Sequence, residues 1–271
     1  MRGSLTGSAE RTEAEAMFQF QTAAPSDVRA ALGIHAVRIG GGVAVAMKRD
    51  RTNYWNKALG FGFTEPVTKN LVADVCDFYR EQHPPVAVLQ FAPAVMPPDF
   101  DDIATAAGLK PSSYWLKLAH GLSVIPARQT DLRVGPVGRD DADRWASVLL
   151  RAFGMPEEDL TDLFASLVGR PDFRSFAAWD GEALVAAAAM FVHDDTANMV
   201  GSGTLPSHRR RGAYSVLLSL RLKEARDSGC RTVFAESGKD TPGERNGSLH
   251  NMHHLGFTVL YERQNWIWRP A

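Results

Sequence analysis

The amino-acid sequence predicts a mixed α/β protein of two domains, each built as a mixed sheet flanked by helices. Segments with the alternating or continuous apolar pattern of strands are interspersed with segments that have the 3.6-residue period of helices. The chain has 271 residues, which exceeds the usual size of one compact domain. Between Gly121 and Asp131, Gly, Ser, Pro and Thr interrupt the apolar pattern, so we interpret this segment as a linker.

The first domain is expected over residues 17–121. Residues 1–16 are rich in Ser, Thr, Glu and Ala, and we expect them to form a flexible tail. After them, the apolar pattern predicts an alternating strand pair near 36–46, a helix near 67–82, a strand at 86–91, a short helix at 100–107 and a strand at 113–119.

The second domain is expected over residues 132–271. A strand at 132–137 and helices at 140–152 and 157–168 come first. Polar turns then separate three antiparallel strands at 173–178, 183–192 and 197–205. A long helix at 212–228, with Gly229 as its C-cap, leads to a strand at 232–236, a helix at 247–255 and strands at 258–260 and 263–268.

Composition excludes several classes of protein. A net charge of −1 gives no global electrostatic reason to expect a nucleic-acid or membrane partner. The longest apolar stretch, 183–192, is about ten residues long and too short to cross a bilayer as a helix. Two cysteines, Cys76 and Cys230, cannot form a metal-ligand cluster, so we expect plain thiols, no metal site and a cytoplasmic location.

The segment from Gly203 to Tyr214 joins the end of a strand to the start of the long helix. Pro206 ends the strand because it has no backbone N–H, and Gly212 lets the chain turn closely at the helix entry. The free N–H groups of the first helical turn and the helix dipole then favour an anion. Arginines at positions 209, 210 and 211 add positive charge, so the segment predicts a diphosphate site.

This segment resembles the acyl-coenzyme A signature of the Gcn5-related N-acetyltransferases (GNAT), in which Arg/Gln-x-x-Gly-x-Gly/Ala opens a helix. Arg209, Gly212 and Tyr214 occupy that pattern, with Tyr214 in place of the usual small residue. The resemblance continues in order and spacing through the strand at 232–236 to the Gly256-Phe257 ending.

The resemblance implies acetyl-CoA or another acyl-CoA as the cofactor. In the family, the strand before the phosphate loop pairs with the pantetheine arm, and an Asn in a later loop often contacts the arm. The residues thereby implicated in cofactor binding are Gly203, Thr204, Leu205, Arg209, Arg210, Arg211, Gly212, Ala213, Tyr214, Asn246 and Asn251.

The first domain resembles a reduced form of the same fold without the arginine loop. Its corresponding stretch, 54–62, has glycines but no basic triplet, so no cofactor is expected there. Its expected roles are packing and shaping a substrate pocket at the domain junction. Tyr54, Trp55 and Asn56 are the candidates for the pocket wall, with simple packing as the alternative.

Aminolysis of a thioester needs a base for the amine and an acid for the leaving thiolate. Many family members place a Tyr acid where this chain has Met252, which cannot donate a proton. Glu236 is the candidate base at the end of its strand. The candidate substitutes for the acid are His250, His253, His254 and Tyr261, of which His250 and Tyr261 are preferred.

The function implied is acetyl-CoA-dependent N-acetyltransfer to an amine by direct attack in a ternary complex, most simply to a small-molecule amine. The first alternative is a non-catalytic acyl-CoA sensor, which Met252 favours. A nucleic-acid module built on the arginine triplet is disfavoured because the nearly neutral chain has no further basic stripe. Neither the acceptor amine nor the oligomeric state follows from the sequence.

Overall fold

The computed structural model describes residues 4–241 and 243–270. The chain divides into two compact units: the first contains the chain up to Lys117 together with the segment from Leu260 onward, and the second contains Leu118–Val259. Each unit is a mixed α/β structure, in agreement with the predicted fold class. In the described part of the chain, no helix is both long enough and apolar enough to span a membrane.

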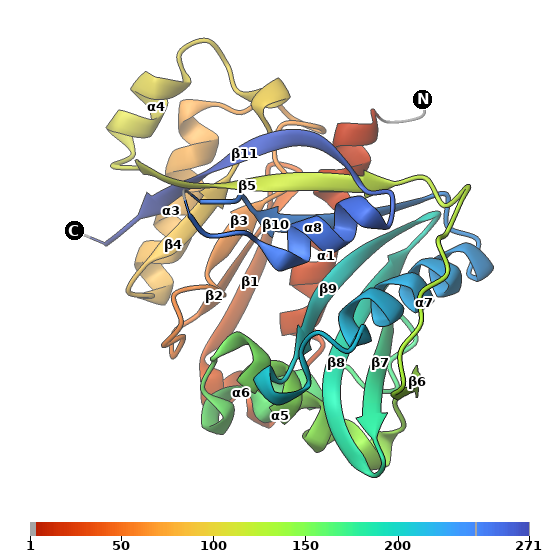
Figure 1. Ribbon diagram of the computed structural model, residues 1–271. Helices are drawn as coiled ribbons and strands as arrows, with labels where there is room; N and C mark the ends of the chain where they lie inside the picture. Colours follow the sequence, from red (N-terminus) through yellow and green to blue (C-terminus); the bar gives the residue numbers. More distant parts are fainter. Residues whose placement is uncertain (1–3, 242, 271) are drawn as a thin grey trace. The chain divides into compact units, whose positions relative to one another are not determined.

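The first unit contains a sheet in the order β1-β2-β3-β4-β11 (Figure 1). The pairs β1–β2, β2–β3 and β4–β11 are antiparallel, and β3–β4 is parallel. Helix α3 packs against β1 and β2 and brings Val72, Val75 and Tyr79 into the core. The elements are α1 (Leu5–Thr22), α2 (Ser26–Leu32), β1 (Ile34–Ile39), β2 (Gly42–Met47), β3 (Lys57–Leu59), α3 (Lys69–Gln82), β4 (Ala87–Gln90), α4 (Phe100–Ala106), the beginning of β5 (Lys110–His120) and most of β11 (Thr258–Trp268).

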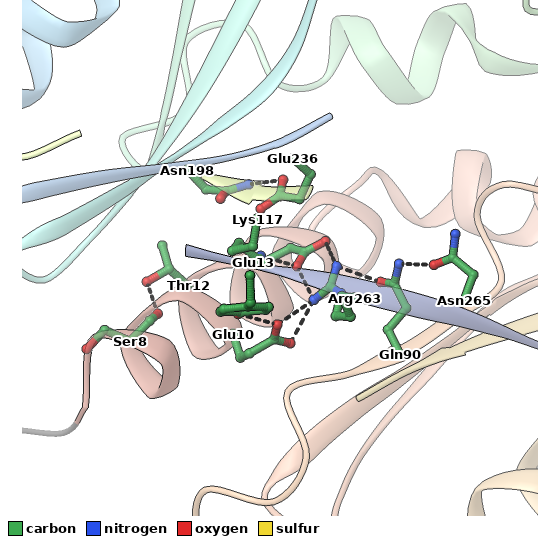
Figure 2. Close-up of polar contacts among 11 residues, drawn as sticks. Ser8, Glu10, Thr12, Glu13, Gln90, Lys117, Asn198, Glu236, Arg263 and Asn265 are labelled. Carbon is green, nitrogen blue, oxygen red and sulfur yellow. Dashed lines mark hydrogen bonds and ion pairs between the residues drawn. The ribbon is translucent and has the colours of Figure 1, made fainter. Parts of the chain in front are cut away.

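The expected flexible tail at residues 1–16 is wrong from Leu5 onward, since these residues form most of α1; residues 1–3 lie outside the described part of the chain. Glu10 and Glu13 of this helix are buried, and both form ion pairs with Arg263 of β11 (Figure 2). The Glu13 carboxylate also pairs with Lys117. A buried ionic network therefore holds a helix whose polar sequence suggested disorder.

The end of the chain also departs from the expected division, in which residues 132–271 form one domain. Residues 258–268 form the single strand β11 instead of two short strands. Asn265, Trp266 and Trp268 pair with β4 of the first unit, and the two tryptophans lie in its core. Consequently, the segment from Leu260 onward belongs to the first unit.

The second unit contains the antiparallel strands β6-β7-β8-β9, with β10 added parallel to β9. Helix α7 covers one face of this sheet, where Ala213 and Leu217 pack on Ala186 and Ala188. Helix α5 contacts β8 and β9 from the other face. The elements are β6 (Arg133–Pro136), α5 (Ala142–Phe153), α6 (Glu157–Ala165), β7 (Phe173–Asp180), β8 (Ala183–His193), β9 (Thr196–Thr204), α7 (Ala213–Asp227), β10 (Thr232–Gly238) and α8 (Gly247–His254).

Candidate functional site

Strands β9 and β10 of the second unit pair only at their beginnings. Their parallel ladder joins residues 232–234 to residues 196–198 and ends at the pair of Asn198 with Phe234. Strand β9 continues to Thr204 and stays paired with β8 on its other side. The edge of β9 after Asn198 is thus left outside the β10 ladder, and an extended ligand can pair with such an edge through main-chain hydrogen bonds.

A β-bulge bends β9 in the same region. Ala188 lies opposite Ser202 whereas Ala189 lies opposite Val200, so Gly201 is the extra residue, and its φ of 66° suits glycine. The buried Arg221 of α7 donates to the carbonyl of Ala189 over 2.9 Å and to that of Gly201 over 3.3 Å. Burial lowers the pKa of Arg221 to about 10. The side chain remains a cation at neutral pH and ties α7 to the bulge.

The loop after β9 turns tightly into α7. Arg210 has a φ of 67° and Gly212 a φ of 81°, both in the left-handed region. A Cβ on Gly212 would lie 2.6 Å from the carbonyl oxygen of Gln129, so only glycine fits there without displacing the backbone. Helix α7 begins at Ala213 with no side-chain cap. Its first N–H groups are therefore available to an anion, as predicted from the sequence.

These elements enclose a cavity of about 600 Å³, which lies in the size range of small-molecule sites. Ser202 and Thr204 line it, and the hydroxyl oxygen of each is buried with no hydrogen-bond partner among the described residues. Buried hydroxyls without partners are costly, so both indicate a polar ligand. The residues around the cavity are Ala152, Ser202, Gly203, Thr204, His208, Arg209, Arg210, Gly212, Ala213, Tyr214, Ser215, Gly247, Ser248 and Asn251.

The three arginines of the loop have different environments. Arg209 and Arg210 line the cavity, and the Arg209 Nε atom donates to the Thr204 carbonyl over 3.3 Å. The side chain of Arg211 instead forms ion pairs with Asp131 and Asp180. Its hydrogen bonds lower the pKa of both carboxyls. The expectation that Arg211 contributes a cofactor-binding side chain is thus not supported, because its charge is already neutralised.

Helix α8 presents Gly247, Ser248 and Asn251 to the cavity. The Asn251 Oδ1 atom accepts from the Ser215 hydroxyl over 2.9 Å, and Ser248 shares a hydrogen bond with the Tyr214 hydroxyl. Burial raises the pKa of Tyr214, so its phenol keeps its proton at neutral pH. Tyr214 therefore adds a hydroxyl to the wall of the cavity where the family pattern has a small residue.

Two residues that were expected to bind the cofactor, Asn246 and Leu205, do not line the cavity. Asn246 is the N-cap of α8: its Oδ1 accepts from the N–H groups of Ser248 and Leu249, and its Nδ2 donates to Ser237 and Gly238. Leu205 donates its N–H to the carbonyl of Val185. Neither residue lines the cavity, so Asn246 acts through the position of α8.

The candidate base Glu236 lies in β10, two residues beyond its last pair with β9. Its Oε2 atom accepts a hydrogen bond from the Asn198 Nδ2 atom over 3.2 Å, which Figure 2 shows. Asn198 is the residue at which the ladder ends. A half-buried carboxylate thus stands where the two strands diverge, a suitable place for a group that receives a proton.

Like Glu236, the two other candidate catalytic residues are not among the residues that line the cavity. His250 contacts Arg245 and His254, and desolvation and the charge of Arg245 lower the pKa of His250. Tyr261 belongs to the first unit, and its hydroxyl donates to Glu10 over 2.7 Å. Burial and the Glu10 charge raise the Tyr261 pKa, so the phenol keeps its proton. Met252, at the position of the usual acid, is buried.

The three candidate substrate residues lie in the first unit. The Asn56 side chain is buried and accepts from the Met47 N–H over 2.7 Å, so its role there is structural. Trp55 is buried against Phe20. Tyr54 lines a small cavity of the first unit, where its ring meets Lys57. Only Tyr54 of the three is placed to contact a small molecule.

The chain's own donors fit an acyl-CoA. Arg209, Arg210 and the free N–H groups of α7 suit a diphosphate, and the open edge of β9 with the unpartnered Ser202 and Thr204 hydroxyls suits an amide-containing arm. Sequence reasoning identified the loop but missed Ser202, Ser215 and Ser248, because nothing in an isolated serine distinguishes a cavity wall from a surface.

Comparison with known proteins gives a consistent result. Residues 142–257 match the model of the acetyltransferase (GNAT) family. No curated protein matches the chain in sequence. Among solved structures, a GCN5-related N-acetyltransferase from Kribbella flavida is 16% identical and superposes with a TM-score of 0.67, covering 100% of this chain and 97% of that one.

Two further structures match over nearly the full length. A GCN5-related N-acetyltransferase from Sphaerobacter thermophilus is 14% identical, with a TM-score of 0.60 and coverage of 100% of this chain and 96% of that one. A tandem GNAT protein from the clavulanic acid biosynthesis pathway is 15% identical, with a TM-score of 0.57 and coverage of 97% of each chain. The C-terminal half of this chain is thus a GNAT family domain, and its fold is similar to GNAT proteins over its full length, a tandem GNAT protein among them.

Proposed function

We propose that the second unit binds an acyl-CoA, most simply acetyl-CoA, and transfers its acyl group to the amine of a small molecule. The observation that carries this proposal is that β9, whose edge lies outside the β10 ladder after Asn198, ends at 202–204 in the wall of the same cavity as Arg209 and Arg210. One cavity therefore offers an open strand edge for an amide-containing arm and a cationic helix N-terminus for a diphosphate.

In this proposal the bound acyl-CoA supplies a thioester with an activated acyl carbon. Glu236 accepts the proton that the attacking amine loses, and Asn198 holds the carboxylate in position through the 3.2 Å hydrogen bond. Holding both reactants in one cavity removes the entropic cost of bringing them together. The amine would attack the acyl carbon directly, the C–S bond would break and the CoA thiolate would leave and take a proton from solvent, so no covalent enzyme intermediate forms.

A non-catalytic acyl-CoA sensor is the second candidate function. It is favoured by the buried Met252, which cannot donate a proton, and by the position of His250 outside the cavity. None of the residues named from the sequence as an acid for the leaving thiolate, His250 and Tyr261 among them, lines the described cavity. Such a protein would bind acyl-CoA in the same way and turn over no amine.

The first experiment is a calorimetric titration of the full chain with acetyl-CoA. A Gly212 variant is a poor test because any Cβ there meets the Gln129 carbonyl and disturbs the fold. Arg210→Glu is sharper, since it reverses a charge on the cavity wall, and Arg226→Glu, at the far end of α7, is the matched control. We expect binding that weakens about tenfold to a hundredfold in Arg210→Glu only.

A second measurement separates the enzyme from the sensor. Release of free thiol from acetyl-CoA is followed with spermidine, kanamycin, glycine and a short peptide with a free N-terminus. Turnover of any of these supports the transferase, whereas tight binding without turnover on the whole panel supports the sensor. No binding of acetyl-CoA to the wild-type protein would contradict both.

A further inference from the structure

The first unit has a cavity of its own, with a volume of about 200 Å³. It lies where β3, β4, β5 and β11 contribute side chains, and all of its lining residues belong to the first unit. Tyr54 and Trp115 form aromatic walls, and Val88 and Ile267 add apolar surface. This volume suits a small organic molecule and is too small for a cofactor the size of coenzyme A.

Lys57 of β3 lies in this cavity as a buried cation. The residue is only 5% exposed, and its Nζ atom lies 3.5 Å from the centroid of the Tyr54 ring and 5.3 Å from that of Trp115. Among the described residues, no carboxylate forms an ion pair with Lys57. Aromatic faces attract an ammonium group only weakly compared with the cost of removing it from water. The charge of Lys57 is therefore left without a counter-ion.

The buried carboxylates of the first unit, those of Asp50, Glu10 and Glu13, already have hydrogen-bond or ion-pair partners. Asp50 accepts hydrogen bonds from its own loop, at the N–H and hydroxyl of Thr52 and the N–H of Trp55. Glu10 and Glu13 balance the two cations Arg263 and Lys117 in the closed buried network of Figure 2. No carboxylate of either group is left to neutralise Lys57.

A chain of hydrogen bonds leads from that network to the cavity. Arg263 donates to the Gln90 Oε1 atom over 3.0 Å, and the Gln90 Nε2 atom donates to the Asn265 Oδ1 atom over 2.6 Å (Figure 2). The Asn265 Nδ2 atom then donates to the Ser113 hydroxyl oxygen over 3.0 Å. Each group in this series accepts a hydrogen bond from the one before it and donates to the next. The Ser113 hydroxyl accepts from Asn265 and can therefore still donate its own hydrogen to a ligand. Gln90, Asn265 and Ser113 all line the cavity.

From these observations we propose that the cavity of the first unit binds the carboxylate of a small organic acid with an apolar body. The Lys57 ammonium and the Ser113 hydroxyl hold the carboxylate, and Tyr54, Trp115 and the aliphatic side chains contact the apolar part. Charge and donor direction both favour an anion, while the aromatic and aliphatic walls favour an organic acid over inorganic phosphate. Because every residue concerned lies in the first unit, the proposal does not depend on acyl transfer in the second.

The test uses four probes on the full chain in a chloride buffer free of carboxylates and phosphate. Benzoate and butyrate are the ligands, benzamide is the neutral counterpart of benzoate, and inorganic phosphate is the anion without an apolar body. Binding is measured by saturation-transfer NMR and titrated to a Kd. We expect saturable binding of at least one carboxylate, with benzamide and phosphate at least about tenfold weaker.

Two variants locate the site. Lys57→Met keeps the length of the side chain without its charge, and Ser113→Ala removes the donor at the exposed rim and spares the core. We expect Lys57→Met to weaken carboxylate binding at least about tenfold and Ser113→Ala to weaken it about threefold to tenfold. The exposed Lys48→Met, just after β2, is the matched control and should change the Kd less than twofold, roughly the scatter of surface changes.

The proposal would be overturned by no carboxylate binding below about 10 mM, by equal binding of benzoate and benzamide, or by equal affinity of the wild type and Lys57→Met. Should Lys57→Met fail to fold by circular dichroism, the comparison of benzoate with benzamide on the wild type and on Ser113→Ala decides alone. Tighter binding of phosphate than of both carboxylates would also contradict it.

Discussion

The Nη1 atom of Arg211 lies 2.6 Å from the Oδ2 atom of Asp180, at the end of β7, so the third arginine of the basic loop is bound to the protein itself. Asp131 pairs with the same guanidinium. The loop therefore presents two arginines to the cavity, Arg209 and Arg210, and holds its shape with the third. This arrangement makes the arginines experimentally distinguishable.

We predict that Arg210→Gln weakens acetyl-CoA binding more than Arg211→Gln does. Arg210 lines the cavity and would lose a charge-assisted contact with a bound phosphate, worth about 1.5–3 kcal/mol. The Arg211 side chain already has two carboxylate partners, so its loss acts mainly on the loop. Calorimetric titration of the two variants side by side measures the difference, and a larger loss in Arg211→Gln would contradict this assignment.

The same ion pairs predict a pH dependence of stability. Arg211 holds the pKa values of Asp131 and Asp180 below their usual value of 3.8. A lowered carboxyl pKa stabilises the folded state fully above the unfolded pKa, and this contribution is lost as the pH falls through the folded pKa. The Tm of the wild type should thus exceed that of Arg211→Gln by a constant amount above about pH 5. The two Tm values should converge at lower pH, and a gap unchanged down to about pH 2 would contradict the idea.

Arg221 should be essential to the bend in β9. Replacing it with Met keeps a long side chain but leaves the carbonyls of Ala189 and Gly201 without their buried donor. We expect the free energy of unfolding to fall by about 2–4 kcal/mol, which is the cost of leaving two buried carbonyls without a hydrogen-bond donor after partial relaxation of the structure. Urea unfolding measures this change. Arg226→Met, exposed on the same helix, is the control and should cost less than about 0.5 kcal/mol.

The buried network of the first unit predicts a large effect from one carboxylate. Burial alone would raise the pKa of Glu13, but Arg263 and Lys117 outweigh it and hold that pKa well below 4.5. Glu13→Gln leaves two buried cations without this partner and should destabilise the fold by about 3–5 kcal/mol. Glu15 lies on the same helix as Glu13, and Glu15→Gln breaks only a partly exposed pair with Arg38 of β1, so it should cost at most about 1 kcal/mol. Equal Tm values for the two variants would contradict a structural role for the network.

This network also shows why the sequence misled at the N-terminus. The residues that hold Glu10 and Glu13 are Lys117 and Arg263, which are about a hundred or more positions away along the chain. A polar segment without an apolar stripe gives no local sign of burial. The place of β11 in the first unit was missed for a similar reason, because the sequence of β11 does not reveal that β4 is its partner.

The arginine loop was predictable because its signals are local. Pro206, the arginines and Gly212 follow one another within a few residues, and each restricts the backbone or the charge by itself. The side-chain environment of Arg211 was not predictable, since Asp131 and Asp180 come from other segments. The same holds for His250, whose place outside the cavity depends on the direction in which α8 turns its faces.

Glu236 provides the sharpest test of catalysis. In Glu236→Gln the side chain keeps its size and can still contact Asn198, but it cannot accept the proton of an attacking amine. We expect kcat with the responsive amine to fall by about 10²–10⁴-fold, the usual contribution of a general base, with little change in the Kd of acetyl-CoA. A more basic medium raises the fraction of neutral amine, so the variant should recover part of its lost kcat at high pH. Its pH–rate profile should therefore shift to higher pH than that of the wild type. Asn198→Ala, which only frees the carboxylate, should reduce kcat less and keep the profile near that of the wild type. A full kcat in Glu236→Gln at neutral pH would remove Glu236 from the mechanism and leave the amine to lose its proton to water.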